Sequence, residues 1–405
     1  MNRRHSSYSR PAPTTDAGAP SGVTRRHAIT TAAAVALLAR PSLARAETGV
    51  TDNEILLGAV YALTGPVRFI TTSYEQGVQS VLNEVNTTGI HGRKIRWLIE
   101  DDAYQPARTL AGAKKLVERD NVFALFGQIG LPTTLAVVPY AEQAKVPFLS
   151  LTATSSPPPV YTWGMQASYT DLMYVLTQHV VKSLGLKKIG YLFQNDDLGE
   201  AGKVGVARAL KELGVPLMAD VGYERGTTDF GTQVLKLRDS GAEMVISMGT
   251  APSTATAVKQ AAAYGYKPTW GTYGVGGSGT LPNLLGDLIN GLVFATEVDS
   301  IYSDAPGVIE ARRVIVKHFP NAQPDFTTFM GYAHAKVLAK ALEMAGRDLT
   351  REKLLAAMVG LGNFDSGVMP LSFSKDKHTG SNGVKIFQWR GGKQVAISPW
   401  TPITK

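Results

Sequence analysis

From residue 54 onward, short apolar runs alternate with amphipathic segments, and this alternation constrains the fold more than any other feature. Strands are expected at 54–63, 94–102, 122–127 and 146–151, with helices around 74–87, from Pro106, and from Thr133 to Ala144. The order repeats after a Pro-rich crossover at 155–171, with strands at 188–193, 217–223, 243–249, 268–273 and 291–298 and helices at 199–213, 230–239 and 254–264. Helices near 306–318, 327–345 and 351–359 and short strands at 371–397 complete the chain. The pattern predicts an α/β fold of two doubly wound, parallel-sheet lobes with a ligand between them, at the carboxyl ends of the strands.

The first 46 residues read as a signal peptide. A polar leader containing Arg25 and Arg26 precedes the apolar run AITTAAAVALLA, and Ala44 and Ala46 form a small-x-small cleavage site. The mature chain is therefore expected to begin near Glu47 and to be periplasmic. The twin arginine resembles a Tat signal, but Ala28 stands where that motif prefers Phe, and a Sec leader also fits.

Composition excludes several classes of protein. The chain has no cysteine, which rules out disulfides, thiol catalysis, cysteine-ligated metals and a lipid-anchored N-terminal cysteine. Its net charge of +8 is concentrated in the leader, which holds seven of the 41 basic residues and one of the 33 acidic ones. The remaining chain is close to neutral, which gives no electrostatic basis for binding nucleic acid.

The sequence GVGGSG at 274–279 has the G-x-G-x-x-G spacing of a dinucleotide-binding turn. Such a turn belongs at the first strand–helix junction of its sheet, whereas this one lies in the last unit of the second lobe. An exported enzyme would also need a supply of dinucleotide. We therefore expect no cofactor and interpret the segment as a flexible loop at the rim of the lobe.

No set of catalytic or metal-binding residues emerges. The seven histidines show no HxxxH pairing, and the chain has neither a GxSxG elbow nor a Walker lysine motif. The paired acids Asp101-Asp102 and Asp196-Asp197 lie at strand ends, where capping of local amides is the favoured role. We predict no metal site and no enzymatic activity.

Two loops after neighbouring strands of the first lobe are suited to a carboxylate. GQIGLPTT (127–134) runs from a strand into a helix start and leaves the backbone N–H groups of Gly130 and Leu131 free for an anion. LTATSS (151–156) presents hydroxyl groups beside it. Capping and turn formation remain an equally good explanation of these loops.

Taken in order, these segments resemble the periplasmic branched-chain amino acid binding proteins of ABC transporters, which have the type I periplasmic binding fold. The resemblance covers about 52–395 and rests on LTGPV (63–67), NTTGIHGRKI (86–95), EDDAYQPA (100–107), 125–150 and 226–253. It implies three segments crossing between the lobes, near 166–168, 297–300 and 375–383. The first lobe would comprise 47–166 and 299–382, and the second 167–298 and 383–405.

The resemblance also implies a set of ligand-binding residues. The solute's carboxylate would be held by the backbone of Gly130 or Leu131, the backbone of Thr152 and the hydroxyl of Thr154. Further contacts would come from Phe69 and Ile70 in the first lobe and from Leu198, Thr250, Ala251 and Tyr273 in the second.

Tyr273, in GTYGVGG, departs from the family pattern. Relatives that bind aliphatic amino acids carry a glutamate beside the glycine-rich loop to pair with the α-ammonium. Burying an ammonium without a counter-charge is costly, so Tyr273 favours an amine-free aliphatic or aromatic acid over a branched-chain amino acid. Aspartates 196 and 197 could in principle replace the missing acid.

The function implied by the resemblance is that of a monomeric solute-binding protein that closes around a small carboxylate and docks on an ABC transporter permease. The alternative is a subunit of the same fold that presents its solute to a membrane sensor or chemoreceptor.

Overall fold

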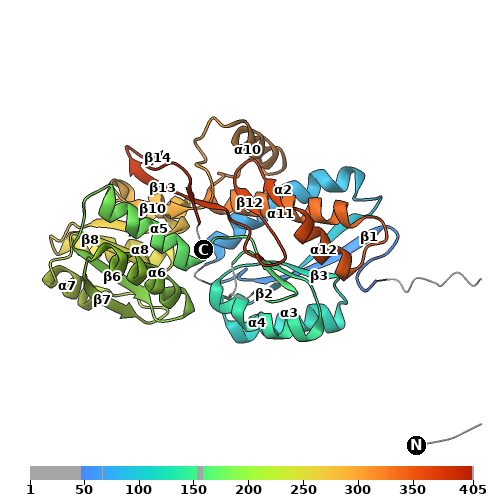
Figure 1. Cartoon of the computed structure of the whole chain (residues 1–405), viewed down its shortest axis with the longest axis horizontal. Coiled ribbons are helices and arrows are strands. Elements are labelled where there is room, and N and C mark those ends of the chain that lie inside the picture. Colours follow the sequence, from blue (N-terminus) through green and yellow to red (C-terminus); the bar gives the residue numbers. More distant parts are fainter. Residues whose placement is uncertain (1–46, 66, 153–157, 404–405) are drawn as a thin grey trace, which may run out of the picture. The chain divides into compact units, whose positions relative to one another are not determined.

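The computed structural model describes residues 47–405, except for 66, 153–157 and 404–405. The predicted signal peptide, 1–46, lies outside these described residues. Within them the structure is α/β, with two central sheets that we use to define a first and a second lobe (Figure 1).

The first sheet is entirely parallel, in the order β2-β1-β3-β4-β5. Its strands are β1 (Glu54–Tyr61), β2 (Lys94–Asp101), β3 (Ala124–Gln128), β4 (Phe148–Ser150) and β5 (Thr162–Gly164). Seven of the eight residues of β1 are buried, which is expected of a central strand covered on both faces.

The second sheet has the order β14-β13-β10-β9-β8-β6-β7, with β15 paired to β13. Its parallel strands are β6 (Ile189–Gln194), β7 (Leu217–Tyr223), β8 (Met244–Met248), β9 (Thr269–Thr272) and β10 (Val293–Thr296). The strands β13 (Gly383–Arg390), β14 (Lys393–Ala396) and β15 (Thr401–Pro402) add an antiparallel edge. The alternation pattern did not predict this edge, because the C-terminal segment returns as a hairpin without an intervening helix.

Helices cover both faces of each sheet. In the first lobe they are α2 (Arg68–Thr88), α3 (Pro106–Lys114), α4 (Leu131–Ala144), α10 (Pro306–His318), α11 (Phe326–Ala345) and α12 (Arg351–Gly360). In the second they are α5 (Tyr169–Lys182), α6 (Asp197–Leu213), α7 (Gly231–Asp239), α8 (Ala251–Ala263) and the short α9 (Thr280–Leu285). In the first lobe α3 and α4 pack on the face of the sheet opposite α2 and α11 (Figure 1).

The chain crosses between the two sheets three times: between β5 and α5, between β10 and α10, and between β12 (Pro370–Ser372) and β13. Strand β12 pairs with β11 (Asn363–Asp365) outside both sheets. We call these connections the crossing segments. The lobe boundaries given above stay a prediction.

Several helices begin one turn earlier than the apolar periodicity indicated. Helix α6 begins at Asp197 with Asp196 as its N-cap, and α8 begins at Ala251 with Thr250 as its N-cap. The extra residues are capping residues and first-turn prolines, such as Pro132 in α4, which do not extend the apolar stripe.

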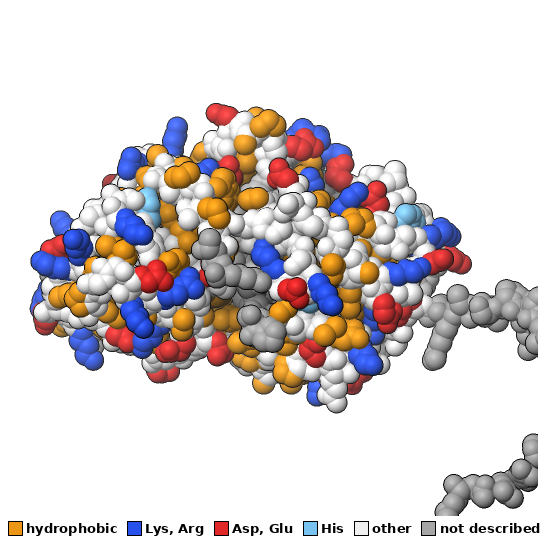
Figure 2. Space-filling view, in the orientation of Figure 1, with side chains coloured by type: hydrophobic (Ala, Val, Ile, Leu, Met, Phe, Trp, Pro, Cys, Tyr) orange, Lys and Arg blue, Asp and Glu red, His pale blue; other side chains and the backbone are white. Residues whose placement is uncertain are grey.

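Charges of both signs are interspersed over the face shown in Figure 2, as expected of a near-neutral body. Among the residues that the structure describes, no helix is both long and apolar enough to cross a membrane.

Candidate ligand-binding site

A cavity lies between the two lobes, where the carboxyl ends of the strands from both sheets meet. Its lining residues are Val67, Ile70, Tyr104, Ile129, Gly130, Leu151, Gln166, Tyr169, Leu198, Thr250, Tyr273, Val275, Ser278, Phe326 and Thr327. Five of the residues named from the sequence are among them: Ile70, Gly130, Leu198, Thr250 and Tyr273. The cavity has a free volume of about 70 Å³, so it holds only a small solute unless the lobes move apart.

Gly130 connects β3 to α4 in a conformation that suits only glycine. Its φ is +97°, and a Cβ at this position would lie 2.6 Å from Cε2 of Tyr104. As the N-cap of α4 it supplies no side chain to the helix. The first-turn N–H groups of a helix have no intrahelical partner, so this end of α4 can donate hydrogen bonds to an acceptor in the cavity.

The other residues named from the sequence do not line the cavity. Leu131 and Phe69 pack with the apolar core of the second lobe and therefore join the lobes. Thr152 and Ala251 are buried behind the lining. Thr154 lies outside the described residues.

Three tyrosines surround the cavity. Tyr169 and Tyr273 contact edge to face, with ring centroids 5.2 Å apart, and Tyr273 donates its hydroxyl proton to the carbonyl of Gly249 at 3.0 Å. Burial raises the pKa values of Tyr104, Tyr169 and Tyr273 above the ordinary value. All three are therefore neutral phenols at physiological pH.

The GVGGSG segment is buried, which corrects the expectation of a flexible loop. Residues Gly274–Gly277 form a 3₁₀ turn whose carbonyls at Gly276 and Gly277 accept hydrogen bonds from Trp389 (2.7 Å) and Gln394 (3.1 Å). A Cβ on Gly274 would fall 2.2 Å from the ring of Phe326. These glycines permit close packing against aromatic rings, and protein atoms occupy the space beside Gly274 that a phosphate would need.

The paired acids are occupied by local contacts. Asp101 accepts hydrogen bonds from the backbone of Leu63 and Thr64, and Asp102 accepts from Tyr104 N and Thr109. Asp196 caps α6 and pairs with Arg225 at 2.6 Å, while Asp197 is exposed. None of the four lines the cavity.

Several polar groups at or near the cavity were missed by sequence reasoning. Gln166 Oε1 and Ser278 Oγ line it, are buried, and have no hydrogen-bond partner. Both carboxyl oxygens of Glu297, buried close by, also have no hydrogen-bond partner among the described residues. The same is true of Oγ1 of Thr152, a residue that the sequence did identify. Burial raises the pKa of Glu297 to about 8, despite the neighbouring Gln166 side chain and Ala167 N–H, which lower it.

Signals for some of these residues were present in the sequence. Gln166 and Glu297 fall in crossing segments that the resemblance implied, Ser278 belongs to GVGGSG, and Tyr104 belongs to EDDAYQPA. No local pattern marks Phe326, which reaches the cavity from the start of α11.

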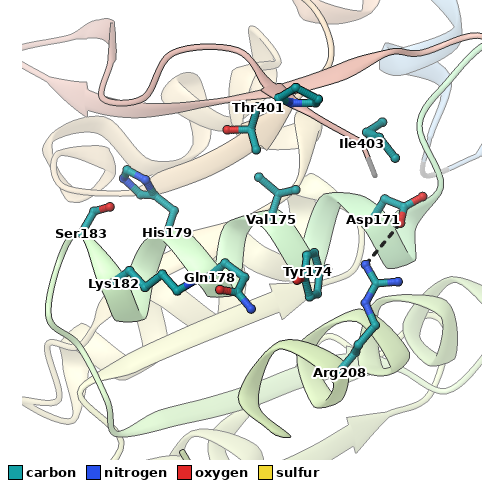
Figure 3. Close-up of a pocket in the computed structure, with 11 residues that line it drawn as sticks. Asp171, Tyr174, Val175, Gln178, His179, Lys182, Ser183, Arg208, Thr401 and Ile403 are labelled. Atoms are coloured by element: carbon teal, nitrogen blue, oxygen red, sulfur yellow. Dashed lines mark hydrogen bonds and ion pairs between the residues drawn. The ribbon is translucent and has the colours of Figure 1, made fainter. Parts of the chain in front are cut away.

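A larger hollow of about 400 Å³ lies on the second lobe between α5, α6 and the C-terminal segment (Figure 3). It contains the ion pair of Arg208 with Asp171, 3.4 Å apart, and the Arg208 guanidinium stacks 3.8 Å from the ring centroid of Tyr174. All of its walls belong to one lobe, so movement of the lobes would not enclose a ligand there. It contains none of the residues named from the sequence.

The cavity between the lobes is polar without being charged, since none of its lining residues has an ionised side chain at neutral pH. Within the described part of the chain, no cluster of His, Asp and Glu could hold a metal ion. The arrangement suits reversible binding of a small molecule that has both an apolar body and polar groups.

Comparisons with known proteins agree with this arrangement. Residues 54–394 match the sequence model of the periplasmic binding protein family. The Leu/Ile/Val-binding protein homolog 7 of Brucella abortus is 23% identical over 370 residues, which cover 85% of this chain and 92% of that protein.

Two solved structures share the fold. A possible leucine/isoleucine/valine-binding protein from Rhodopirellula baltica has a TM-score of 0.80 at 26% identity, covering 87% of this chain and 98% of the other. A fatty acid ABC transporter substrate-binding protein from Thermomonospora curvata has a TM-score of 0.80 at 23% identity, covering 88% and 95%.

Proposed function

This chain belongs to the periplasmic binding protein family, and on that premise we propose that it binds a small, amine-free carboxylic acid and delivers it to the permease of an ABC transporter. Proteins of this family bind solutes and are not enzymes. The observation that carries the proposal is the cavity between the lobes, whose described lining is uncharged and includes the unpartnered hydroxyl of Ser278 and Gly130 at the uncapped N-terminus of α4.

The polar groups on one side of the cavity suit a carboxylate. Gly130 leaves the first-turn N–H groups of α4 uncapped, and the positive end of a helix favours an anion. Ser278, from the second lobe, also lines the cavity, and its buried hydroxyl has no hydrogen-bond partner among the described residues, so it can donate to the solute. Thr154, predicted to donate its hydroxyl, remains part of the proposal.

The absence of an acidic lining residue supports an amine-free solute. An ammonium group in this cavity would lose its hydration and meet no fixed negative charge, which costs several kcal/mol. Asp196 is already neutralised by Arg225, so it does not replace the missing glutamate. The Tyr273 hydroxyl is likewise engaged by Gly249.

The apolar residues that line the cavity determine which hydrocarbon group of the solute fits. Ile70, Leu198, Val275 and the tyrosine rings suit a short aliphatic or an aromatic group. The fold neighbour described as a fatty acid substrate-binding protein supports amine-free acids as ligands of this fold, whereas the Leu/Ile/Val-binding homolog supports amino acids. The narrow cavity argues against a long chain.

Calorimetry with matched pairs tests the solute class. Isocaproate should bind more tightly than leucine, and phenylpropanoate more tightly than phenylalanine, by at least about a hundredfold given the cost of burying an unpaired ammonium. Micromolar binding of leucine with weaker binding of isocaproate would overturn the proposal.

Transport is tested separately in cells. Deleting the gene should abolish high-affinity uptake of the radiolabelled acid, and restoring the full chain should recover it. We take the protein to act as a monomer, for which light scattering should give a single chain's mass with and without solute.

We also propose that the protein is exported and cleaved near Ala46. N-terminal sequencing of the secreted form should begin near Glu47, because Ala44 and Ala46 form the small-x-small cleavage site. Export that is unchanged when Arg25-Arg26 is replaced by Lys-Lys would assign the leader to the Sec route.

A further inference from the structure

Two of the three crossing segments bring buried polar side chains together at the cavity, and their oxygen atoms make no hydrogen bond of good geometry with the described residues. Gln166, just after β5, lines the cavity, and its Oε1 is buried without a partner. Glu297, just after β10, is fully buried, and both of its carboxyl oxygens lack a partner. Gln166 Oε1 and, behind it, the Glu297 carboxyl group therefore have no hydrogen bond of good geometry to any described residue.

The two side chains are neighbours, arranged one behind the other. Gln166 is buried and lines the cavity, while Glu297 lies against the Gln166 side chain and the backbone N–H of Ala167 and does not itself line the cavity. The group that a solute meets directly is therefore a neutral amide, and the carboxyl group lies behind it.

Unpartnered acceptors at this depth are rarely left so in a folded protein, because burying a polar group without a hydrogen bond is costly. A donor supplied by the bound molecule would satisfy Gln166 Oε1 directly and let its amide group donate to Glu297 behind it.

We propose that Gln166, supported by Glu297, forms a second polar subsite that accepts a hydrogen bond from a hydroxyl group of the solute, so that the native ligand is a hydroxy-substituted carboxylic acid. This inference rests on the proposed function, because it takes the carboxylate to be held by the loops of the first lobe. Gln166 binds the solute; Glu297 is a positioning residue that holds the amide in place.

A hydroxyl suits this subsite better than an ammonium. Gln166 carries no charge, and it separates the solute from Glu297, whose raised pKa keeps it largely protonated at neutral pH. A cation would thus give up its hydration for a neutral amide oxygen. A hydroxyl group gives up a hydrogen bond to water and gains one to the neutral amide oxygen.

Calorimetry on the full mature protein tests the subsite with three compounds of one skeleton: isocaproate, α-hydroxyisocaproate and leucine. A second series uses phenylpropanoate, phenyllactate, para-hydroxyphenylpropanoate and phenylalanine, which moves the hydroxyl to another position. In at least one series the hydroxy acid should bind roughly tenfold to a hundredfold more tightly than the plain acid, because a site built around a hydrogen bond discriminates against a ligand that lacks it.

Variants assign that preference to the two residues. Gln166→Met should reduce the ratio of hydroxy-acid affinity to plain-acid affinity to within about twofold, whatever its effect on the plain acid. Glu297→Leu should also reduce the preference for the hydroxy acid. Glu297→Gln, which is neutral and keeps hydrogen-bonding groups, should retain most of that preference. Gln178→Met is the matched control, because Gln178 Oε1 is also buried and unpartnered but lies at the hollow of Figure 3.

The outcomes separate the two proposals. Equal binding of hydroxy and plain acids by the wild-type protein would refute the subsite and leave the proposed function standing. Preferential binding of the amino compounds would refute both. A preference for the hydroxy acid that survives Gln166→Met would contradict the assignment of the subsite to Gln166. If that variant does not fold, the comparison of hydroxy and plain acids in the wild-type protein decides whether the subsite exists.

Discussion

Arg225 of the second lobe donates a hydrogen bond to the backbone carbonyl of Tyr104 of the first lobe, at a distance of 3.1 Å. The same guanidinium lies 4.8 Å from the Tyr104 ring centroid and pairs with Asp196 at 2.6 Å. Tyr104 lines the cavity, so this contact fixes one wall of it while joining the two lobes. Because the contact joins the two lobes, we expect it to break if the lobes separate.

Replacing Arg225 with Met should therefore weaken solute binding by destabilising the closed state. Loss of a partly exposed, charge-assisted hydrogen bond should cost about 1 kcal/mol, or roughly fivefold in affinity, mainly through faster release. Stopped-flow fluorescence measures the dissociation rate. Arg208→Met is the control, since Arg208 also pairs with an aspartate and stacks on a tyrosine but contacts only its own lobe; equal effects of both substitutions would exclude a specific role for Arg225.

Gly130→Ala should lower both stability and affinity. The backbone conformation disfavours any side chain, and the added methyl would lie 2.6 Å from the Tyr104 ring and 2.9 Å from Thr133 Oγ1. We expect a loss of about 2–3 kcal/mol in the free energy of unfolding, measured by urea denaturation, from combined strain and crowding. Gly214→Ala, with φ of +64° and no atoms within 4 Å, should show only the smaller backbone cost and normal binding.

Tyr273→Glu should change which solutes bind. A carboxylate at this position would give an α-ammonium its partner and would repel the carboxylate of an amine-free acid. In the glutamate variant, the ratio of isocaproate affinity to leucine affinity should be at least tenfold lower than in the wild type. This corresponds to a shift of more than about 1.4 kcal/mol in binding free energy in favour of leucine. Tyr273→Phe, which removes only the hydroxyl bonded to Gly249, should keep the wild-type ratio. An unchanged ratio in the glutamate variant would place the amine elsewhere.

Glu297 should make the protein less stable as the pH rises. Its pKa is about 8 in the folded chain and near the ordinary value of 4.5 when unfolded, so the folded state binds the extra proton between these values. The contribution of Glu297 to the free energy of unfolding is greatest below pH ~4.5. As the pH rises, this contribution falls by up to ~1.4 kcal/mol per pH unit, and it levels off above pH ~8. Denaturation at several pH values should show this slope in the wild type and its loss in Glu297→Gln. The exposed Glu352→Gln control should retain it.

The sequence predicted the order of elements well because buried parallel strands and amphipathic helices leave strong local patterns. Strand β1 and helix α3, which begins at Pro106, lie close to where those patterns placed them. The antiparallel edge formed by β13 was not predicted, since pairing direction depends on which distant strand the C-terminal hairpin meets. Sequence periodicity carries no information on that choice.

Only some of the residues that line the cavity were predicted, again because local patterns do not show which distant segments meet. Loops that follow strands were identifiable, and Gly130 and Leu198 do reach the cavity. The side chain of Leu131 packs with the core of the second lobe, and the predicted contact through its backbone N–H stays a prediction. Phe326 and Glu297 enter from elements far away in sequence, and only the three-dimensional arrangement places them beside the cavity.

The hydrogen bond from Trp389 to Gly276 spans 113 positions and anchors the cavity wall to the last turns of the chain. During synthesis, every strand of the first sheet and all parallel strands of the second exist before Trp389 has been added. We therefore expect this wall of the cavity to be completed only when the C-terminal hairpin docks, because contacts of long sequence separation form slowly.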